Sequence, residues 1–70
     1  MDNERTAADI FKEARMSKRW TQEEVAKSAG LDTNSYAKIE RGYNKPSRES
    51  ISKLLEVLPI KKSDILLLLK

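Results

Sequence analysis

Between residues 21 and 42, helix-start and helix-stop signals follow one another so closely that only short helices and tight turns fit. Residues 21–24 (TQEE) form a capping box, in which a Thr hydroxyl accepts from the backbone three residues later and a Glu reaches back. Gly30 ends that helix, because glycine adopts the left-handed conformation at little cost. Asp32 can cap a second helix, which stops at Gly42. This succession outlines a helix-turn-helix, with helices over residues 22–28 and 33–41.

The remainder of the chain predicts three more helices. Apolar residues recur at i, i+3, i+4 and i+7 from Ala7 and again from Ile51, which predicts helices over residues 7–18 and 48–58. Thr6 and Ser47 stand where caps for these two helices are needed. A fifth short helix follows Pro59, over residues 61–70. No stretch alternates with period two for long enough to be a strand. The predicted fold class is therefore all-α, a compact bundle of five short helices.

A chain of 70 residues has room for one domain. We expect residues 1–6 to be a flexible N-terminus and residues 7–70 to form a single domain. The N-terminus lacks the basic start and apolar middle of a signal peptide, and no apolar run is long enough to span a membrane. With the absence of cysteine, these features predict a cytoplasmic protein without a membrane partner.

The composition argues against an enzyme. The chain has no His and no Cys, so the commonest general base, the thiol nucleophile and zinc sites built on Cys and His are absent. Its only glycines, Gly30 and Gly42, do not form a phosphate-binding loop. The adjacent Glu23 and Glu24 would point about 100° apart on a helix and do not form a pair. We therefore predict no catalytic residues, no metal, no cofactor and no small-molecule ligand.

The helix over residues 33–41 divides into two faces. Tyr36, Ile39 and Glu40 share one side, and the other side is small, polar or basic. This second face holds Thr33, Asn34, Ala37, Lys38 and Arg41. Such a face can enter a major groove, where Asn pairs with adenine, Lys donates to guanine and a methyl group meets thymine. A solvated polar face has the same periodicity, so periodicity alone leaves both interpretations open.

Charge is distributed unevenly along the chain. Residues 1–35 hold six basic and seven acidic residues, whereas residues 36–70 hold eight basic and four acidic ones. From Lys38 to Arg48 there are four basic residues, and Glu40 is the only acid. A helix face beside a basic loop is the arrangement that sets register on duplex DNA. The alternative is that these lysines and arginines only keep a small protein soluble.

The order and spacing of these motifs are recognisable. TQEEVA at residues 21–26, Gly30-Leu31, Tyr36, IERG at residues 39–42 and the later NKPS come at the distances expected for one family. Over about residues 7–69 the chain resembles the lambda-repressor/Cro-like (XRE-type) helix-turn-helix family of DNA-binding transcriptional regulators. The resemblance implies a five-helix domain of bacterial or phage origin that is associated with the nucleoid.

The resemblance also implies roles for individual residues. The residues expected at base edges are Thr33, Asn34, Ala37 and Lys38. Those expected at DNA phosphates are Gln22, Ser35, Tyr36, Arg41, Tyr43, Asn44 and Lys45. Gln22 would also brace the second helix of the motif, and the Tyr36 hydroxyl would reach the surface. Arg15 and Glu40 match a family pair that joins two helices through a largely buried salt bridge.

The last predicted helix contains five consecutive apolar residues, at positions 65–69. A helix that is apolar all round must be buried all round, which one small domain cannot do at its own terminus. We expect Ile65, Leu66 and Leu69 to join the core. Ile60, Leu67 and Leu68 would then form a dimer interface, with residues 61–70 as the dimerisation helix. The alternative is that this end packs into a groove of its own domain.

Two functional hypotheses follow. The first is a homodimeric, sequence-specific transcriptional regulator, a repressor or autoregulator acting on a palindromic operator in double-stranded DNA. The second is a protein-interaction module of the same fold, an antitoxin or anti-repressor that binds its partner through the leucine-rich C-terminal helix. The sequence does not choose among phage, plasmid, restriction-modification and toxin–antitoxin contexts.

Overall fold

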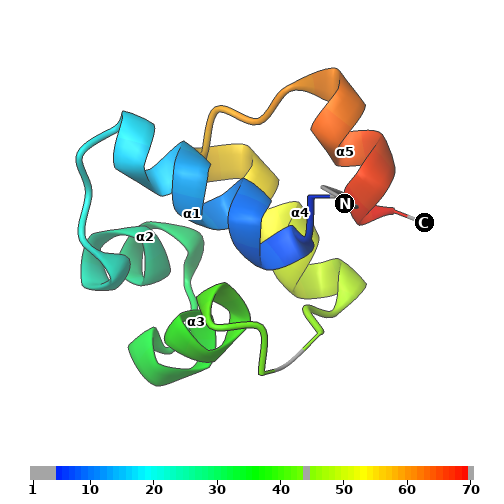
Figure 1. The fold of residues 1–70 in the computed structure, drawn as a ribbon. Helices are drawn as coiled ribbons and strands as arrows, with labels where there is room; N and C mark the ends of the chain where they lie inside the picture. Colours follow the sequence, from blue (N-terminus) through cyan, green and yellow to red (C-terminus); the bar gives the residue numbers. More distant parts are fainter. Residues whose placement is uncertain (1–4, 44, 70) are drawn as a thin grey trace.

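In the part of the chain that the structure describes, five α-helices are arranged around one core (Figure 1). The computed structural model describes residues 5–43 and 45–69, and within these ranges there is no strand. The helices are α1 (Ala7–Ser17), α2 (Gln22–Ala29), α3 (Thr33–Glu40), α4 (Arg48–Val57) and α5 (Lys62–Leu68). The predicted all-α class and the five helices are confirmed. The predicted bounds of the first four helices differ from the observed ones by one residue at most, whereas α5 is shorter than predicted.

Local side-chain caps explain where the helices begin. At α1, the Asp9 N–H donates to the Thr6 hydroxyl at 3.2 Å, and the Thr6 N–H donates back to the Asp9 carboxylate. Thr21 and Glu24 form the same reciprocal pair at the start of α2. Asp32 and Ser47 cap α3 and α4. In the described part of the chain, Lys61 precedes α5 and provides no side-chain cap for it.

The first three helices end in left-handed turns. Gly30 has a φ of 73° after α2, and Gly42 has a φ of 79° after α3. At the end of α1 the same turn is made by Arg19, with a φ of 59°. There the Arg19 N–H donates to the Met16 carbonyl at 3.0 Å and the Trp20 N–H donates to the Arg15 carbonyl at 3.3 Å. These paired bonds satisfy helix-end carbonyls that would otherwise lack a partner.

The core lies where α1 and α2 pack against the inner side of α3 and where α4 packs against α2. Phe11, Val25, Ala26, Tyr36 and Leu54 are completely buried in it. The small side chain of Ala26 is buried within α2, which packs against both α3 and α4. These contacts fix α3 to the domain along its inner side.

Trp20 lies half-buried at the rim of this core. The Lys18 ammonium stands 3.9 Å from the centre of its ring, a cation–π contact. The same ammonium donates to the Val57 carbonyl at 3.4 Å, so Lys18 joins the end of α1 to the end of α4.

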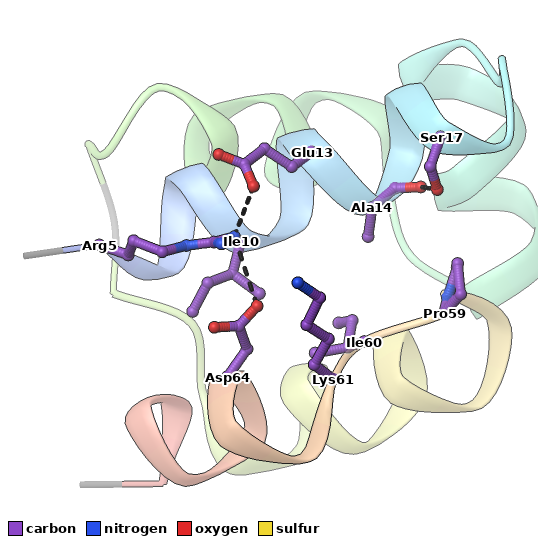
Figure 2. A pocket seen from close by; sticks show the side chains of 9 residues that line it. All are labelled: Arg5, Ile10, Glu13, Ala14, Ser17, Pro59, Ile60, Lys61 and Asp64. Atoms are coloured by element: carbon purple, nitrogen blue, oxygen red, sulfur yellow. Dashed lines mark hydrogen bonds and ion pairs between the residues drawn. The ribbon is translucent and has the colours of Figure 1, made fainter.

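Arg5 links the N-terminus to α5 (Figure 2). Its guanidinium lies 2.6 Å from the Glu13 carboxylate on α1 and 3.4 Å from the Asp64 carboxylate on α5. We predicted residues 1–6 to be flexible, but Arg5 is paired and Thr6 caps α1. Residues 1–4 lie outside the described residues. Arg5 and Thr6 therefore take part in the packing of the domain.

The orientation of α5 differs from our prediction. Leu66 and Leu69, which we expected in the core, are 65% and 47% exposed. Ile60 and Leu68 instead pack against the core, and Leu67 is half-buried, so the three residues predicted for a dimer interface are not its exposed ones. The prediction was wrong because Asp64 is buried beside Arg5, which turns the side shared by Asp64 and Leu68 inward. Among the described helices, none is long and apolar enough to cross a membrane.

Candidate nucleic-acid interface

The outer side of α3 is open to solvent and carries polar side chains. Asn34, Ser35 and Lys38 are exposed, and Thr33 is half-buried at the first turn. Asp32 fixes that turn, since its carboxylate accepts from the Ser35 N–H at 3.1 Å. An exposed amide can accept from and donate to adenine, and an exposed ammonium can donate to guanine. The structure therefore leaves three of the four predicted base-reading side chains able to contact a ligand.

Ala37, the fourth predicted base-reading residue, does not lie on this surface. It is only 8% exposed, so its methyl group has little area to offer to a thymine. The prediction treated α3 as a helix buried on one side only. In the structure α3 packs against both α1 and α2, so a wider arc of its circumference is buried.

Tyr36 does not reach a DNA phosphate either. Its side chain is completely buried, and its hydroxyl donates to the Phe11 carbonyl at 3.5 Å inside the domain. Burial raises the pKa of the Tyr36 phenol well above its ordinary value, and the nearby Glu40 carboxylate raises it further. Tyr36 is a core residue that fills the space between α3 and α1.

One carboxylate fixes α3 to two other helices. Glu40 accepts from the Arg15 Nε at 2.7 Å and from an Arg15 terminal nitrogen at 3.2 Å, so the pair is bidentate. The Gln22 amide, at the start of α2, donates to the same carboxylate at 3.0 Å. Arg15 also donates to the Trp20 carbonyl at 2.8 Å. The ion pair and the bracing bond that the resemblance implied are thus both present.

The cluster changes the acidity of its members. Burial alone would raise the pKa of Glu40, but the hydrogen bond from Arg15, the nearby Tyr36 hydroxyl and the hydrogen bond from Gln22 outweigh it and hold that pKa below the ordinary value. The hydrogen bond to Glu40 raises the pKa of Arg15. Glu40 therefore remains ionised at neutral pH although its side chain is only 3% exposed.

Acidification should destabilise the domain through this carboxylate. Because the pKa of Glu40 is lower in the folded state, its contribution is complete above the ordinary value of 4.5 and is lost as pH falls through the folded value. As the pH is lowered below about 4.5, we expect the free energy of unfolding of the wild type to decrease more steeply than that of Glu40→Gln. Urea unfolding at a series of pH values measures both slopes. Equal slopes would contradict the low pKa of Glu40.

A basic strip continues from the end of α3. Arg41, Tyr43, Lys45 and Arg48 are exposed, and Tyr43 reaches 72%. None of the three cations forms an ion pair within the part of the chain that the structure describes. Glu40, the only acid between Thr33 and Arg48, is buried and paired. We call Arg41, Tyr43, Lys45 and Arg48 together the basic strip. Its cations can bind phosphates without first breaking a salt bridge.

Asn44, predicted at a phosphate, lies outside the described residues. Arg48 was not among the predicted contacts, although the run of basic residues from Lys38 onward includes it. It is exposed at the first position of α4, directly after the Ser47 cap, and so extends the basic strip.

Within the described residues, no group of three or more His, Cys, Asp or Glu could hold a metal ion.

Comparison with known proteins gives one match. A family model described as Helix-turn-helix matches residues 11–65, which is most of the chain. The matched region runs from α1 into α5 and so contains the whole outer side of α3 and the basic strip. No curated protein and no solved structure matches the sequence.

Proposed function

Because the chain belongs to the XRE/lambda-repressor-like helix-turn-helix family of DNA-binding regulators, we propose that it is a sequence-specific repressor or autoregulator. The proposal includes a homodimer on a palindromic operator in double-stranded DNA. The observation that carries it is the exposed outer side of α3, with Asn34 and Lys38, next to Arg41 and Lys45, two exposed cations without an ion pair among the described residues. This arrangement combines base-reading groups with groups that bind phosphates.

The two kinds of contact would have different roles. The basic strip supplies affinity for any duplex by displacing counterions from phosphates, so that part of the binding weakens steeply with salt. Asn34 and Lys38 would read base edges in the major groove, which gives preference for one sequence. Thr33 and Ser35, at the first turn of α3, can donate hydroxyl hydrogen bonds to a base or a phosphate. Gln22 keeps a second amide hydrogen for a phosphate while its first is bound to Glu40.

Two substitutions separate these roles. Duplexes are first selected from a random pool, and affinities for the selected and a random duplex are then measured by fluorescence anisotropy over a series of salt concentrations. Asn34→Ala should cost about 1–3 kcal/mol on the selected duplex and much less on the random one. Lys45→Ala should weaken binding to both and reduce the slope of log K against log salt by about 1.

Lys62→Ala is a matched control, because Lys62 is exposed on α5, which lies across the domain from α3 (Figure 1). It should change neither the sequence preference nor the salt slope. Equal losses on both duplexes for Asn34→Ala would rule out its base-reading role. Salt-independent wild-type binding would contradict phosphate contact as a whole.

The homodimer is supported by the exposed side of α5. Leu66 and Leu69 lie three residues apart and are largely exposed, a surface that a second copy of the chain can cover.

The double substitution Leu66→Ser and Leu69→Ser should weaken dimerisation by roughly 100-fold or more, since a two-fold interface loses four leucine side chains. Sedimentation equilibrium measures the dissociation constant. Met16→Ser, on α1, is the control, because Met16 is 58% exposed but lies on another helix. If the control weakens the dimer and the double substitution does not, the interface lies elsewhere.

The same two leucines favour one second candidate, the protein-interaction module. In that case the double substitution would abolish binding to a partner protein, and the wild type would show no preference for any selected duplex. The selection experiment therefore distinguishes the two candidates.

A further inference from the structure

The turn between α1 and α2 places an arginine where the other turns place glycine. Arg19 has a φ of 59°, and among the described residues it is the only non-glycine with a positive φ. Gly30 and Gly42 occupy the corresponding positions after α2 and α3. An L-residue is destabilised in this conformation relative to glycine, so the fold alone does not account for an arginine.

The Arg19 side chain takes no part in holding the turn together. It is exposed and, within the described ranges, forms no ion pair and no side-chain hydrogen bond. The neighbouring Lys18, in contrast, lies over the Trp20 ring and donates to the Val57 carbonyl. Of two adjacent cations, one is used in packing and the other is left to solvent.

The turn that carries Arg19 is attached to the C-terminal end of α3. The next residue, Trp20, gives its carbonyl to Arg15, and Arg15 binds Glu40 at the last position of α3. Gln22, three residues after Arg19, donates to the same Glu40 carboxylate. Arg15, before the turn, and Gln22, after it, thus both bind Glu40. Glu40 is followed directly by Arg41, the first residue of the basic strip.

We propose that Arg19 is a further phosphate-binding residue, which places a guanidinium at the start of α2 in addition to the cations of the basic strip. This inference rests on the proposed DNA-binding function. A guanidinium can bind two phosphate oxygens at once, which a glycine at this position cannot do. Residues in disfavoured backbone conformations are found preferentially at functional sites, which agrees with this assignment.

The test uses Arg19→Gly in the full chain, because stability and binding should then change in opposite directions. Glycine adopts the left-handed conformation without the cost that an L-residue has there. The Tm should therefore rise by roughly 4 °C in thermal unfolding followed by circular dichroism. Loss of one phosphate contact should reduce the slope of log K against log salt by about 0.9, which corresponds to roughly eightfold weaker binding at about 0.1 M salt. The loss should be the same on the selected duplex and on a random one.

Two further variants keep the interpretation unambiguous. Arg19→Asn keeps a residue that tolerates the left-handed conformation but removes the charge, and it should lose the same affinity and slope as Arg19→Gly. Arg19→Lys keeps the charge and should retain the slope. If both variants lose the same DNA affinity, greater flexibility of the turn in Arg19→Gly cannot be the cause, because Arg19→Asn does not introduce a glycine.

The outcomes separate this inference from the proposed function. If the wild type binds duplexes with a salt dependence that Arg19→Gly and Arg19→Asn leave unchanged, Arg19 does not bind phosphate and the inference is overturned, while the proposed function stands. If the wild type binds no duplex, the proposed function fails. A fall in Tm for Arg19→Gly would overturn the premise that arginine is unfavourable here.

Discussion

Replacing Arg15 by methionine is expected to lower the free energy of unfolding by about 3–5 kcal/mol, one of the two largest effects we predict. The Glu40 carboxylate would remain buried without its bidentate partner, and of its hydrogen bonds only the one from the Gln22 amide would be left. Urea unfolding followed by circular dichroism and by the fluorescence of Trp20, the only tryptophan, measures the loss.

A double variant provides the control. Combining Arg15→Met with Glu40→Leu removes both charges, and a pair of apolar side chains of similar volume should restore most of the stability. The interaction energy from the four-member cycle then gives the strength of the pair itself. A loss below about 1 kcal/mol for Arg15→Met alone would mean that the pair is solvated like a surface salt bridge.

Replacing Tyr36 by alanine should cost a similar amount, about 3–5 kcal/mol, because it leaves a cavity at the centre of the core. Tyr36→Phe keeps the ring and removes only the hydroxyl that donates to Phe11, so it should cost about 1 kcal/mol or less. Unfolding in urea measures both. The contrast tests the assignment of Tyr36 to the core.

The same pair of variants tests the rejected phosphate role. The Tyr36→Phe variant should bind DNA with the affinity and the salt slope of the wild type, since a buried hydroxyl cannot touch a phosphate. A reduced slope for Tyr36→Phe would restore the phosphate role that the structure argues against.

The helix starts could be predicted because each depends on residues close together in the sequence. The Thr21–Glu24 box, Asp32 and Ser47 all act over three residues, and the structure forms each of these caps. The orientation of α5 could not be predicted in this way. It involves contacts between residues far apart in the sequence, because Leu68 packs against the core and Asp64 pairs with Arg5 near the other end of the chain.

In the candidate site, too, some features could be predicted from local sequence and others depend on the packing of the whole domain. The exposed positions of Asn34 and Lys38 follow from helical periodicity, which places them opposite Ile39 and Glu40. The ring of Tyr36 is buried on the side that periodicity predicts. The burial of its hydroxyl and of Ala37 depends instead on how many neighbours α3 has, which is a property of the packed domain. The backbone conformation of Arg19 also depends on the whole turn, and the sequence around it contains no glycine to mark the position.

The Glu40 carboxylate has a consequence for recognition, because donors from two helices meet on it. Any sliding or rotation of α3 against α1 or α2 would break a bond in a place that water reaches poorly. If the proposed function holds, the backbone of α3 would need no rearrangement when a duplex binds. Adjustment would then fall to the duplex, so that sequences whose grooves deform easily would be preferred even at base pairs which the protein never touches.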